Sequence, residues 1–463
     1  MKSITGKDIL LRAVFCIALC GTAVQTVSAE TVENLKDVQV VTLSNGIPLY
    51  VKKNTANRKL ALAVIVKGGT DYLTRETSGL ENALFIMMTY GSKNYSYDKL
   101  QQLAYQMSFS ISPSSSREGS VLAMSCIDYY FDKVLPVFTD AFINPVYNED
   151  QYKILMTNYK QELQQLQTDP QSMLGYTVTK TVFSGHPYEV SSVVKPYSIQ
   201  NITIENMKRL HDRDMDARRI MVVAVGNFDT EKLAEQLDGT LGTIAAQTYE
   251  LASQTIPPLK IGGTPVVITS DAAAGTGYLE KEYAGPSIDS TDLSAAAVAA
   301  SMYSQVLYNV VREKYGACYT PSCSISPMKA GLADVYIFKA SDLAGVVKYE
   351  KEAQDIFASG KVIDGKNDDG SYRFSPVADR LEGYKNQYIN SFYDSSVTNG
   401  GVAGRIATSL LEFGDPYTVD EKIVQIGKVS ADEVEKAFKK YWVDNTYQWF
   451  AVVGPADKDK IQF

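Results

Sequence analysis

Two segments of this chain are similar to each other, and this internal repeat constrains the fold more than any other feature. Each copy has a helix-like stretch, an apolar run, a glycine and an acidic residue, and the copies span residues 204–229 and 431–457. This order predicts a helix, a buried strand, a tight turn and a second helix that begins near the acid. Gly226 and Gly454 hold the same place in the two copies, and about half of the chain separates them. A repeat at this distance predicts a duplicated domain.

The segment between the two copies marks the predicted domain boundary. Residues 245–263 contain a Pro-Pro pair, a Gly-Gly pair and several Ser, Thr and Gln, which is the composition of an exposed linker. We therefore expect an N-terminal domain at 36–244 and a C-terminal domain at 264–463. At 463 residues the chain is also too long for one ordinary hydrophobic core.

Strand-like and helix-like patterns are mixed within each half. Alternating apolar residues predict strands, and apolar residues that recur every three or four positions predict helices. Residues 364–370 are polar and predict a solvated surface loop. The mixture is that of an α+β fold rather than a regular β-α-β alternation. The main strands are expected at 38–43, 47–52, 60–66 and 317–325, and the main helices at 128–143, 152–167, 294–312, 346–359 and 377–393.

The N-terminus has the features of a secretory signal peptide at residues 1–29. Three basic residues precede an apolar run at 13–24, and Val27-Ser28-Ala29 offers a small-residue cleavage site. This pattern predicts export to the periplasm. A lipid anchor at Cys20 is not expected, because the preceding residue is Leu19 rather than a small one. No later stretch reaches about 18 apolar residues, so we expect no transmembrane segment.

The charge of the chain excludes one class of partner. Its formal net charge is −8, and removal of the signal, which carries three basic residues and one acid, takes this to −10. An acidic chain is a poor nucleic-acid binder, because phosphate binding depends on clustered Lys and Arg. Three cysteines remain, Cys126, Cys318 and Cys323, and this odd number argues against a disulfide framework.

Residues 78–88, Ser-Gly-Leu-Glu-Asn-Ala-Leu-Phe-Ile-Met-Met, resemble the metal-binding helix of the M16 (insulinase and processing-peptidase) family. In that family a Gly-Leu pair introduces a helix that carries H-x-x-E-H. Here Asn82 and Ile86 stand in the places of the two histidines, and Phe85 stands in the place of the catalytic glutamate. Zinc needs lone-pair donors, and its bound water needs a carboxylate base. The chain is therefore expected to be inactive alone and to bind no metal or other cofactor.

The two histidines of the chain do not replace the missing pair. His186 and His211 lie far apart in the sequence, so they cannot form an i, i+4 pair on one helix. His186 precedes a proline in a turn, and His211 lies beside Asp212 in a helix-like stretch. Structural roles are expected for both.

Further segments resemble M16 landmarks in their usual order, and the resemblance covers nearly all of the chain after residue 29. It implies two similar α+β domains, each an antiparallel-rich sheet with helices packed on one face, which enclose a cavity for an extended peptide. The segments are 43–46, 68–70, 91–96 and 185–188, together with the two repeat copies.

The resemblance also gives Glu162 a place in the degenerate site. The family's third zinc ligand is a glutamate on a later helix, and Glu162 follows Ile86 at the spacing by which that glutamate follows the second histidine. It is a candidate relic of the ligand position, expected to face Asn82. The alternative is one polar helix residue among many. One carboxylate and one amide do not make a zinc site, which needs three or four donors.

The second half keeps a motif that the resemblance links to substrate binding. Residues 312–319, Arg-Glu-Lys-Tyr-Gly-Ala-Cys-Tyr, resemble the family's R-E-x-x-G-x-x-Y segment. In active members the arginine and tyrosine hydrogen-bond the peptide carbonyl near the scissile bond, which implies this role for Arg312 and Tyr319. Both side chains can donate to an oxygen that gains negative charge. The alternative is an arginine that satisfies helix-end carbonyls and a tyrosine in a half-buried strand.

The strand that binds peptide in the family is altered in the first half. Residues 110–116 read Ser-Ile-Ser-Pro-Ser-Ser-Ser, where the family usually has an Asn-Ala pair. Pro113 has no backbone N–H, and strand addition depends on such donors. Productive peptide binding beside the lost zinc helix is therefore not expected on this ground either.

Two functions from different classes fit these residues. The first is a non-catalytic, substrate-binding subunit of a two-chain M16 peptidase, which supplies Arg312 and Tyr319 to a partner that holds zinc on an intact H-x-x-E-H. The second is a peptide-binding or scaffolding protein of the cell envelope with no hydrolytic role. A lone hydrolase of another type is disfavoured, because the chain has no G-x-S-x-G motif and no histidine placed to assist its cysteines.

Overall fold

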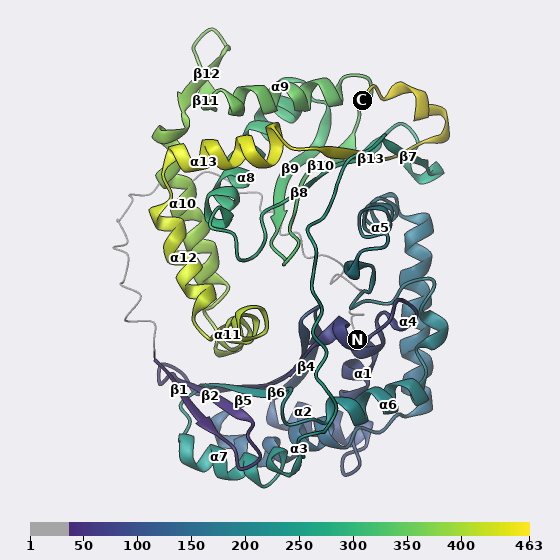
Figure 1. The fold of residues 1–463 in the computed structure, drawn as a ribbon, viewed down its shortest axis with the longest axis vertical. Helices are drawn as coiled ribbons and strands as arrows, with labels where there is room; N and C mark the ends of the chain where they lie inside the picture. Colours follow the sequence, from purple (N-terminus) through teal and green to yellow (C-terminus); the bar gives the residue numbers. More distant parts are fainter. Residues whose placement is uncertain (1–36) are drawn as a thin grey trace.

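The computed structural model describes residues 37–463, so the predicted signal peptide at 1–29 lies outside the described residues. Two main sheets lie in the two halves of the molecule, with further helices on their outer sides (Figure 1). The first has the order β1-β2-β6-β3-β5-β4, and the second has the order β7-β13-β8-β10-β9. The strands of the first sheet are β1 (Val38–Thr42), β2 (Pro48–Lys53), β3 (Lys59–Lys67), β4 (Ser110–Ser115), β5 (Gly119–Ile127) and β6 (Ile220–Gly226). Those of the second are β7 (Val266–Thr269), β8 (Gly277–Ala284), β9 (Cys318–Ser326), β10 (Leu332–Ala340) and β13 (Tyr447–Val453).

The two sheets share one topology, and this explains the repeat in the sequence. The strand of the first copy, β6, pairs in parallel with β2 and antiparallel with β3. The strand of the second copy, β13, pairs in parallel with β7 and antiparallel with β8. The next two pairs of each sheet are antiparallel as well. The prediction of an α+β fold with two homologous, antiparallel-rich domains is therefore confirmed.

The helices and strands mostly follow the predicted pattern, with three differences. The helix expected at 152–167 ends at Thr168, and an additional helix begins at Pro170, because proline is suited to the first helical position and Asp169 caps Ser172 N–H at 2.8 Å. Residues 364–370 lie in a hairpin of β11 (Lys361–Lys366) and β12 (Tyr372–Pro376) rather than in a plain loop. The second repeat copy ends in a 3-10 helix, Pro455–Lys460, where the first has an α-helix. The α-helices are α1 (Leu80–Met88), α2 (Tyr97–Met107), α3 (Phe131–Ile143), α4 (Glu149–Thr168), α5 (Pro170–Val182), α6 (Ile204–Asp214), α7 (Thr230–Asp238), α8 (Leu293–Leu307), α9 (Val346–Ala358), α10 (Val377–Asp394), α11 (Asn399–Phe413), α12 (Thr418–Lys428) and α13 (Ala431–Phe438).

Each sheet is also covered on its second face, by a helix from the other half. Seven consecutive residues of β3 are buried, which requires apolar cover on both faces of the sheet. Ala61 and Ala63 of β3 pack against Ala403 and Ala407 of α11, a helix of the second half (Figure 1). In return, α5 of the first half packs on β8 and β13. The small side chains let α11 approach the sheet closely. Because each half contributes a helix to the sheet of the other half, the two halves are joined.

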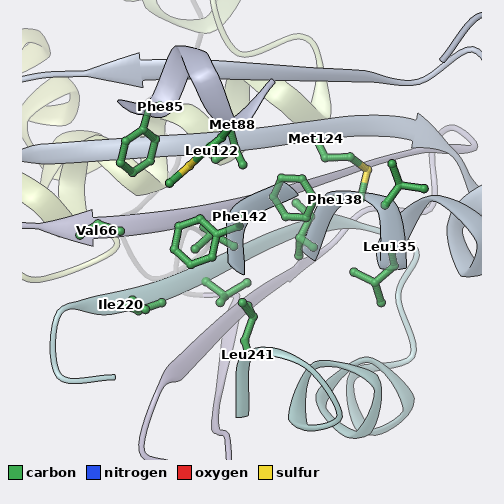
Figure 2. Close-up of a cluster of buried hydrophobic side chains, with 14 of the residues drawn as sticks. Val66, Phe85, Met88, Leu122, Met124, Leu135, Phe138, Phe142, Ile220 and Leu241 are labelled. Carbon is green, nitrogen blue, oxygen red and sulfur yellow. The ribbon is translucent and has the colours of Figure 1, made fainter. Parts of the chain in front are cut away.

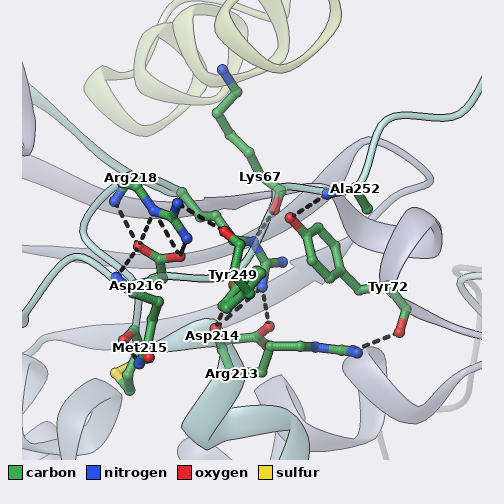
Figure 3. A network of polar contacts seen from close by, with 11 residues as sticks. Lys67, Tyr72, Arg213, Asp214, Met215, Asp216, Arg218, Tyr249 and Ala252 are labelled. Carbon is green, nitrogen blue, oxygen red and sulfur yellow. Dashed lines mark hydrogen bonds and ion pairs between the residues drawn. The ribbon is translucent and has the colours of Figure 1, made fainter.

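The predicted linker is irregular, as expected, but it is held against the body of the protein. Ala252 N–H donates to the hydroxyl of Tyr72 at 3.0 Å, and Arg218 donates to the carbonyl of Tyr249 at 3.0 Å (Figure 3). Leu259 is buried in a small apolar cluster. The segment therefore connects the two halves and is held in place by these contacts. Among residues 37–463, the helices are all too short or too polar to cross a membrane.

Candidate functional site

The start of α1 is fixed by a glycine and by the segment that follows α5. Gly79 has a φ of 81°, and a Cβ at this position would lie 2.3 Å from the backbone nitrogen of Val194. A glycine is therefore required both by the left-handed backbone and by the close contact. Ser191 N–H also donates to the Ser78 hydroxyl at 3.0 Å. These contacts fix the orientation of α1, the helix that contains the degenerate motif.

Phe85, in the place of the catalytic glutamate, is part of the main hydrophobic core. Its side chain is fully buried in the same cluster as Met88, Leu122 and Phe138 (Figure 2). Ile86 is partly buried and packs against this cluster. A phenyl ring cannot take a proton from water, and a carboxylate without a partner would be costly in this environment. The structure thus gives Phe85 a packing role.

Asn82 contacts Tyr159 of α4, which the sequence reasoning missed. The Tyr159 hydroxyl donates to Oδ1 of Asn82 at 2.9 Å. Burial raises the pKa of Tyr159, so its hydroxyl stays protonated as a donor. Glu162, expected to face Asn82, lies one turn further along α4, and burial raises its pKa. The i, i+3 spacing of Tyr159 and Glu162 was the available signal, because it places both on one face of the helix.

These side chains do not fit a zinc ion. Phe85 and Ile86 offer only carbon, the Asn82 oxygen accepts from Tyr159, and Glu162 is a single carboxylate. A zinc site needs three or four nitrogen, sulfur or oxygen donors. Across the described part of the chain, no three His, Cys, Asp or Glu side chains come close enough together to hold a metal ion. The chemistry of this site is therefore not that of a metal-bound water.

A buried charged cluster lies next to the degenerate motif and was also missed. Glu81 of α1 is 3% exposed, and burial and the charge of Asp214 raise its pKa. Arg219 pairs with Asp214 at 2.8 Å and lies 3.7 Å from the centre of the Tyr72 ring. One oxygen of Glu81 has no hydrogen-bond partner. Asp214 is also part of the network beside the linker (Figure 3), and the charges of Asp214 and Arg219 act on Glu81 of α1.

Arg312 and Tyr319 lie close together at the edge of the second sheet. Arg312 is in a π-helix, Tyr308–Lys314, that continues α8, and Tyr319 is in the edge strand β9. Arg312 Nη1 donates to the backbone carbonyl of Tyr319 at 2.5 Å, and its guanidinium lies 5.1 Å from the centre of the Tyr319 ring. Tyr319 is 61% exposed. A widened helical turn of this kind often occurs at functional sites.

The described part of the structure shows no direct contact between the Arg312–Tyr319 pair and the degenerate metal site around Asn82. Within residues 37–463, no hydrogen bond, ion pair or ring contact connects Arg312 or Tyr319 with Asn82 or Glu162. The altered strand at 110–116 does lie at the edge of the first sheet, as β4, where Pro113 is opposite Leu122 of β5. The Arg312–Tyr319 pair therefore lies in the second half and the degenerate metal helix in the first half, without a direct contact of these kinds between them.

Both histidines have backbone partners. His211 is buried, and its Nε2 lies 2.9 Å from the carbonyl of Phe142. Nδ1 of His186 accepts from Tyr188 N–H at 3.1 Å, and its Nε2 lies 2.9 Å from the carbonyl of Pro257 in the linker. These contacts agree with the structural roles expected for both residues.

Comparison with known families decides the classification. The model of the insulinase family, peptidase family M16, matches residues 49–196. The model of the peptidase M16 inactive domain matches residues 201–363. The chain belongs to the M16 peptidase family. It is an M16 peptidase homologue with Asn82, Phe85 and Ile86 at the positions predicted for the metal-binding motif.

Relatives of this M16 chain include subunits of larger assemblies. The probable mitochondrial-processing peptidase subunit beta of Arabidopsis thaliana is 20% identical over 90% of this chain and 78% of its own length. Cytochrome b-c1 complex subunit 1 of Caenorhabditis elegans is 20% identical over 91% of this chain and 90% of its own. The non-peptidase homolog YmxG of Helicobacter pylori is 18% identical over 44% of this chain and 48% of its own.

A solved M16 structure has the same fold. The peptidase M16 inactive domain from Pseudomonas fluorescens matches with a TM-score of 0.75 and 15% identity, over 90% of this chain and 98% of that one. At this identity the likeness shows the fold alone.

Proposed function

We propose that this chain is the non-catalytic, substrate-binding subunit of a heteromeric M16 zinc peptidase. Its partner would be an M16 chain with an intact H-x-x-E-H, which holds the zinc ion. Arg312 and Tyr319 would bind an extended peptide in the partner's active site. The subunit role is supported by the subunit names of relatives and by a relative named as a non-peptidase.

The observation that carries the proposal is the contrast between the two halves. The first half has phenylalanine and isoleucine in the places of the catalytic base and one ligand, whereas the second half presents Arg312 beside an exposed Tyr319 at a sheet edge. Arginine has five N–H donors, and Arg312 uses one of them on the Tyr319 carbonyl. Its Nε lies 3.8 Å from Oε1 of Glu313, and the remaining N–H groups together with the Tyr319 hydroxyl can stabilise a carbonyl oxygen that gains charge.

Reconstitution with the partner tests this role. The purified chain is mixed with an exported M16 chain that has H-x-x-E-H, and hydrolysis of a fluorogenic peptide is followed. Arg312→Ala should lower kcat of the pair about a hundredfold, which is the usual effect of losing one donor to a developing oxyanion. Arg209→Ala, an exposed arginine of α6, is the control and should have no effect. An unchanged rate with Arg312→Ala would show that the proposed role is wrong.

The second candidate is a peptide-binding or scaffolding protein without hydrolysis. Pro113 in the edge strand β4 and the likeness to a cytochrome b-c1 complex subunit favour it. It predicts a stable complex with envelope proteins that contains no H-x-x-E-H chain. Affinity purification of the tagged full chain under native conditions, followed by mass spectrometry, separates the two candidates. Both candidate functions include export to the periplasm, which we propose from the signal-like pattern of residues 1–29.

A further inference from the structure

Two irregular backbone features of the second half flank the edge strand β9. The first is the π-helix Tyr308–Lys314, which contains Arg312 and packs against β9. The second is a β-bulge in β10, the strand next to β9 (Figure 1), where the register against β8 shifts between Ile337 and Ala340. Widened helical turns and β-bulges both occur often beside functional sites. The bulge therefore marks β10 as a candidate contributor to the site of Arg312 and Tyr319.

Lys339 lies in this bulge, directly across from Tyr319. Its two chain neighbours, Phe338 and Ala340, pair with the residues on either side of Tyr319 in β9. Neighbouring strands of a sheet are about 5 Å apart. The backbone of Lys339 therefore lies beside the backbone of Tyr319.

Two aromatic rings connect Lys339 with Arg312. The ammonium of Lys339 lies 5.3 Å from the centre of the Phe338 ring. The centres of the Phe338 and Tyr319 rings are 6.1 Å apart, in an edge-to-face contact. The guanidinium of Arg312 lies 5.1 Å from the centre of the Tyr319 ring. The two cations thus contact one aromatic pair, and a peptide that reaches Arg312 and Tyr319 also comes within reach of Lys339.

The backbone of Lys339 has a conformation that suits glycine. Its φ is 53°, in the left-handed region, where a residue with a side chain is strained and Gly or Asn is favoured. Strained residues of this kind cluster at active sites and ligand-binding sites. A lysine at this position indicates that its side chain has a role that offsets the strain.

The ammonium of Lys339 is available to a ligand. The side chain is exposed, and among residues 37–463 it has no hydrogen bond or ion pair. The carboxylate nearest in sequence is that of Asp342, whose oxygens accept from the Tyr349 hydroxyl at 2.9 Å and from Gly345 N–H at 3.1 Å. The three donors of the ammonium can therefore bind an anion from outside the chain.

We propose that Lys339 is a specificity-determining residue, which binds an acidic side chain of a peptide held by Arg312 and Tyr319. A hydrogen bond from an ammonium to a carboxylate is stronger than one between neutral groups. The inference rests on the peptide-binding role proposed for Arg312 and Tyr319, and it adds a preference for Asp or Glu. The site lies on the second sheet, so Pro113 in the edge strand of the first sheet does not affect it.

The substrate preference of the reconstituted pair tests this role. An internally quenched decapeptide of Ala, Leu and Gln is compared with a set in which one Gln at a time is replaced by Glu. One Glu peptide should be cleaved with a kcat/KM about tenfold above that of the parent peptide, because a charge-assisted hydrogen bond replaces a neutral one. Equal kcat/KM for all peptides would overturn the role of Lys339 and leave the proposed function intact. No hydrolysis of any peptide would contradict the proposed function and the role of Lys339 with it.

Charge reversal separates a direct contact from a structural effect. Lys339→Glu should lose the preference for the Glu peptide, and it should cleave a peptide with Lys at the same position about tenfold faster than the wild type does. Lys458→Glu makes the same change at an exposed lysine of the same half and should keep the wild-type preference. A preference for Glu that survives in Lys339→Glu would overturn the assignment of Lys339.

Lys339→Gly tests the strain and needs no partner chain. Glycine adopts the left-handed backbone without steric cost, so Tm of the full chain should rise by about 1–2 °C although a side chain is removed. Lys458→Gly, at an ordinary backbone position, should give no rise. A fall in Tm of Lys339→Gly would show that Lys339 stabilises the fold, which would contradict a side chain kept for binding.

Discussion

The hydroxyl of Tyr159 donates to Oδ1 of Asn82 at 2.9 Å, which joins α4 to α1 at the predicted degenerate metal site. The oxygen that could have served as a weak ligand is therefore engaged in a hydrogen bond. Phe85, on the same helix as Asn82, is fully buried in the hydrophobic core. At this predicted site Tyr159 hydrogen-bonds Asn82 and Phe85 packs in the core, so both aromatic side chains have structural partners.

The purified chain should hold no zinc. After dialysis against zinc chloride and then against buffer, elemental analysis should give well below one zinc per chain, because the donor set cannot complete a site. EDTA should leave Tm unchanged, since no folding energy comes from a metal. Zinc near one equivalent per chain would contradict our description of α1.

Phe85→Ala should destabilise the chain by about 3–5 kcal/mol, because it leaves a cavity in the core around Met88 and Leu122. The midpoint of urea unfolding measures the effect. Tyr105→Ala is the matched control, since Tyr105 is an aromatic residue that is 88% exposed, and its cost should stay within about 0.5 kcal/mol. Similar midpoints for the two variants would show that Phe85 is not a core residue.

Glu81 should make the chain less stable as the pH rises. Its folded pKa is raised by burial above its ordinary value of 4.5, so the folded state binds more protons than the unfolded state between these two values. Stability is then greatest below pH 4.5 for this group and falls by at most about 1.4 kcal/mol per pH unit above it. Asp214 contributes in the same direction, because its pKa is also raised by burial.

Glu81→Gln should reduce this slope and raise the stability at pH 8 relative to the wild type. Urea unfolding at several pH values between 5 and 8 measures it. Glu205→Gln, at an exposed position of α6, should leave the slope as in the wild type. A wild-type slope that persists in Glu81→Gln would assign the effect to other groups.

Tyr319→Phe removes only a hydroxyl and tests the second half of the proposed pair. In the reconstituted peptidase it should lower kcat about a hundredfold with little change in KM, because the hydroxyl acts on the oxyanion rather than on the bound peptide. Tyr105→Phe, at an exposed tyrosine, should match the wild type. A change in KM alone would limit Tyr319 to peptide binding.

Two glycines of α11 should respond in opposite ways to alanine. Gly404 lines a cavity of about 190 Å³ beside β4, and a Cβ there meets no atom within 4 Å. Gly404→Ala should therefore stabilise the chain by about 0.5–1 kcal/mol through helix propensity. At Gly401 a Cβ would lie 2.4 Å from the Ser395 carbonyl oxygen, so Gly401→Ala should destabilise it. Thermal unfolding of both variants measures the two effects, and a change of Tm in the same direction for both would contradict them.

Much of the fold followed from local patterns in the sequence. The helix at 346–359 and the strand at 317–325 were predicted close to the bounds of α9 and β9, because apolar periodicity reflects the element itself. The hairpin at 361–376 was missed, because its polar tip carries no buried face to produce alternation. The candidate site was predicted only in part. Asn82, Phe85 and Ile86 were found by motif, whereas Tyr159 was not.

The sequence by itself determined the two similar domains and the side-chain atoms that α1 carries, which do not suit zinc. A sequence pattern that occurs twice predicts a domain that occurs twice. Whether a residue can bind zinc depends on the donor atoms of its side chain. The tertiary structure decided which segments far apart in the chain come into contact: Tyr159 with Asn82, and α11 with β3. These contacts join segments far apart in the chain, and they depend on packing that no local pattern records.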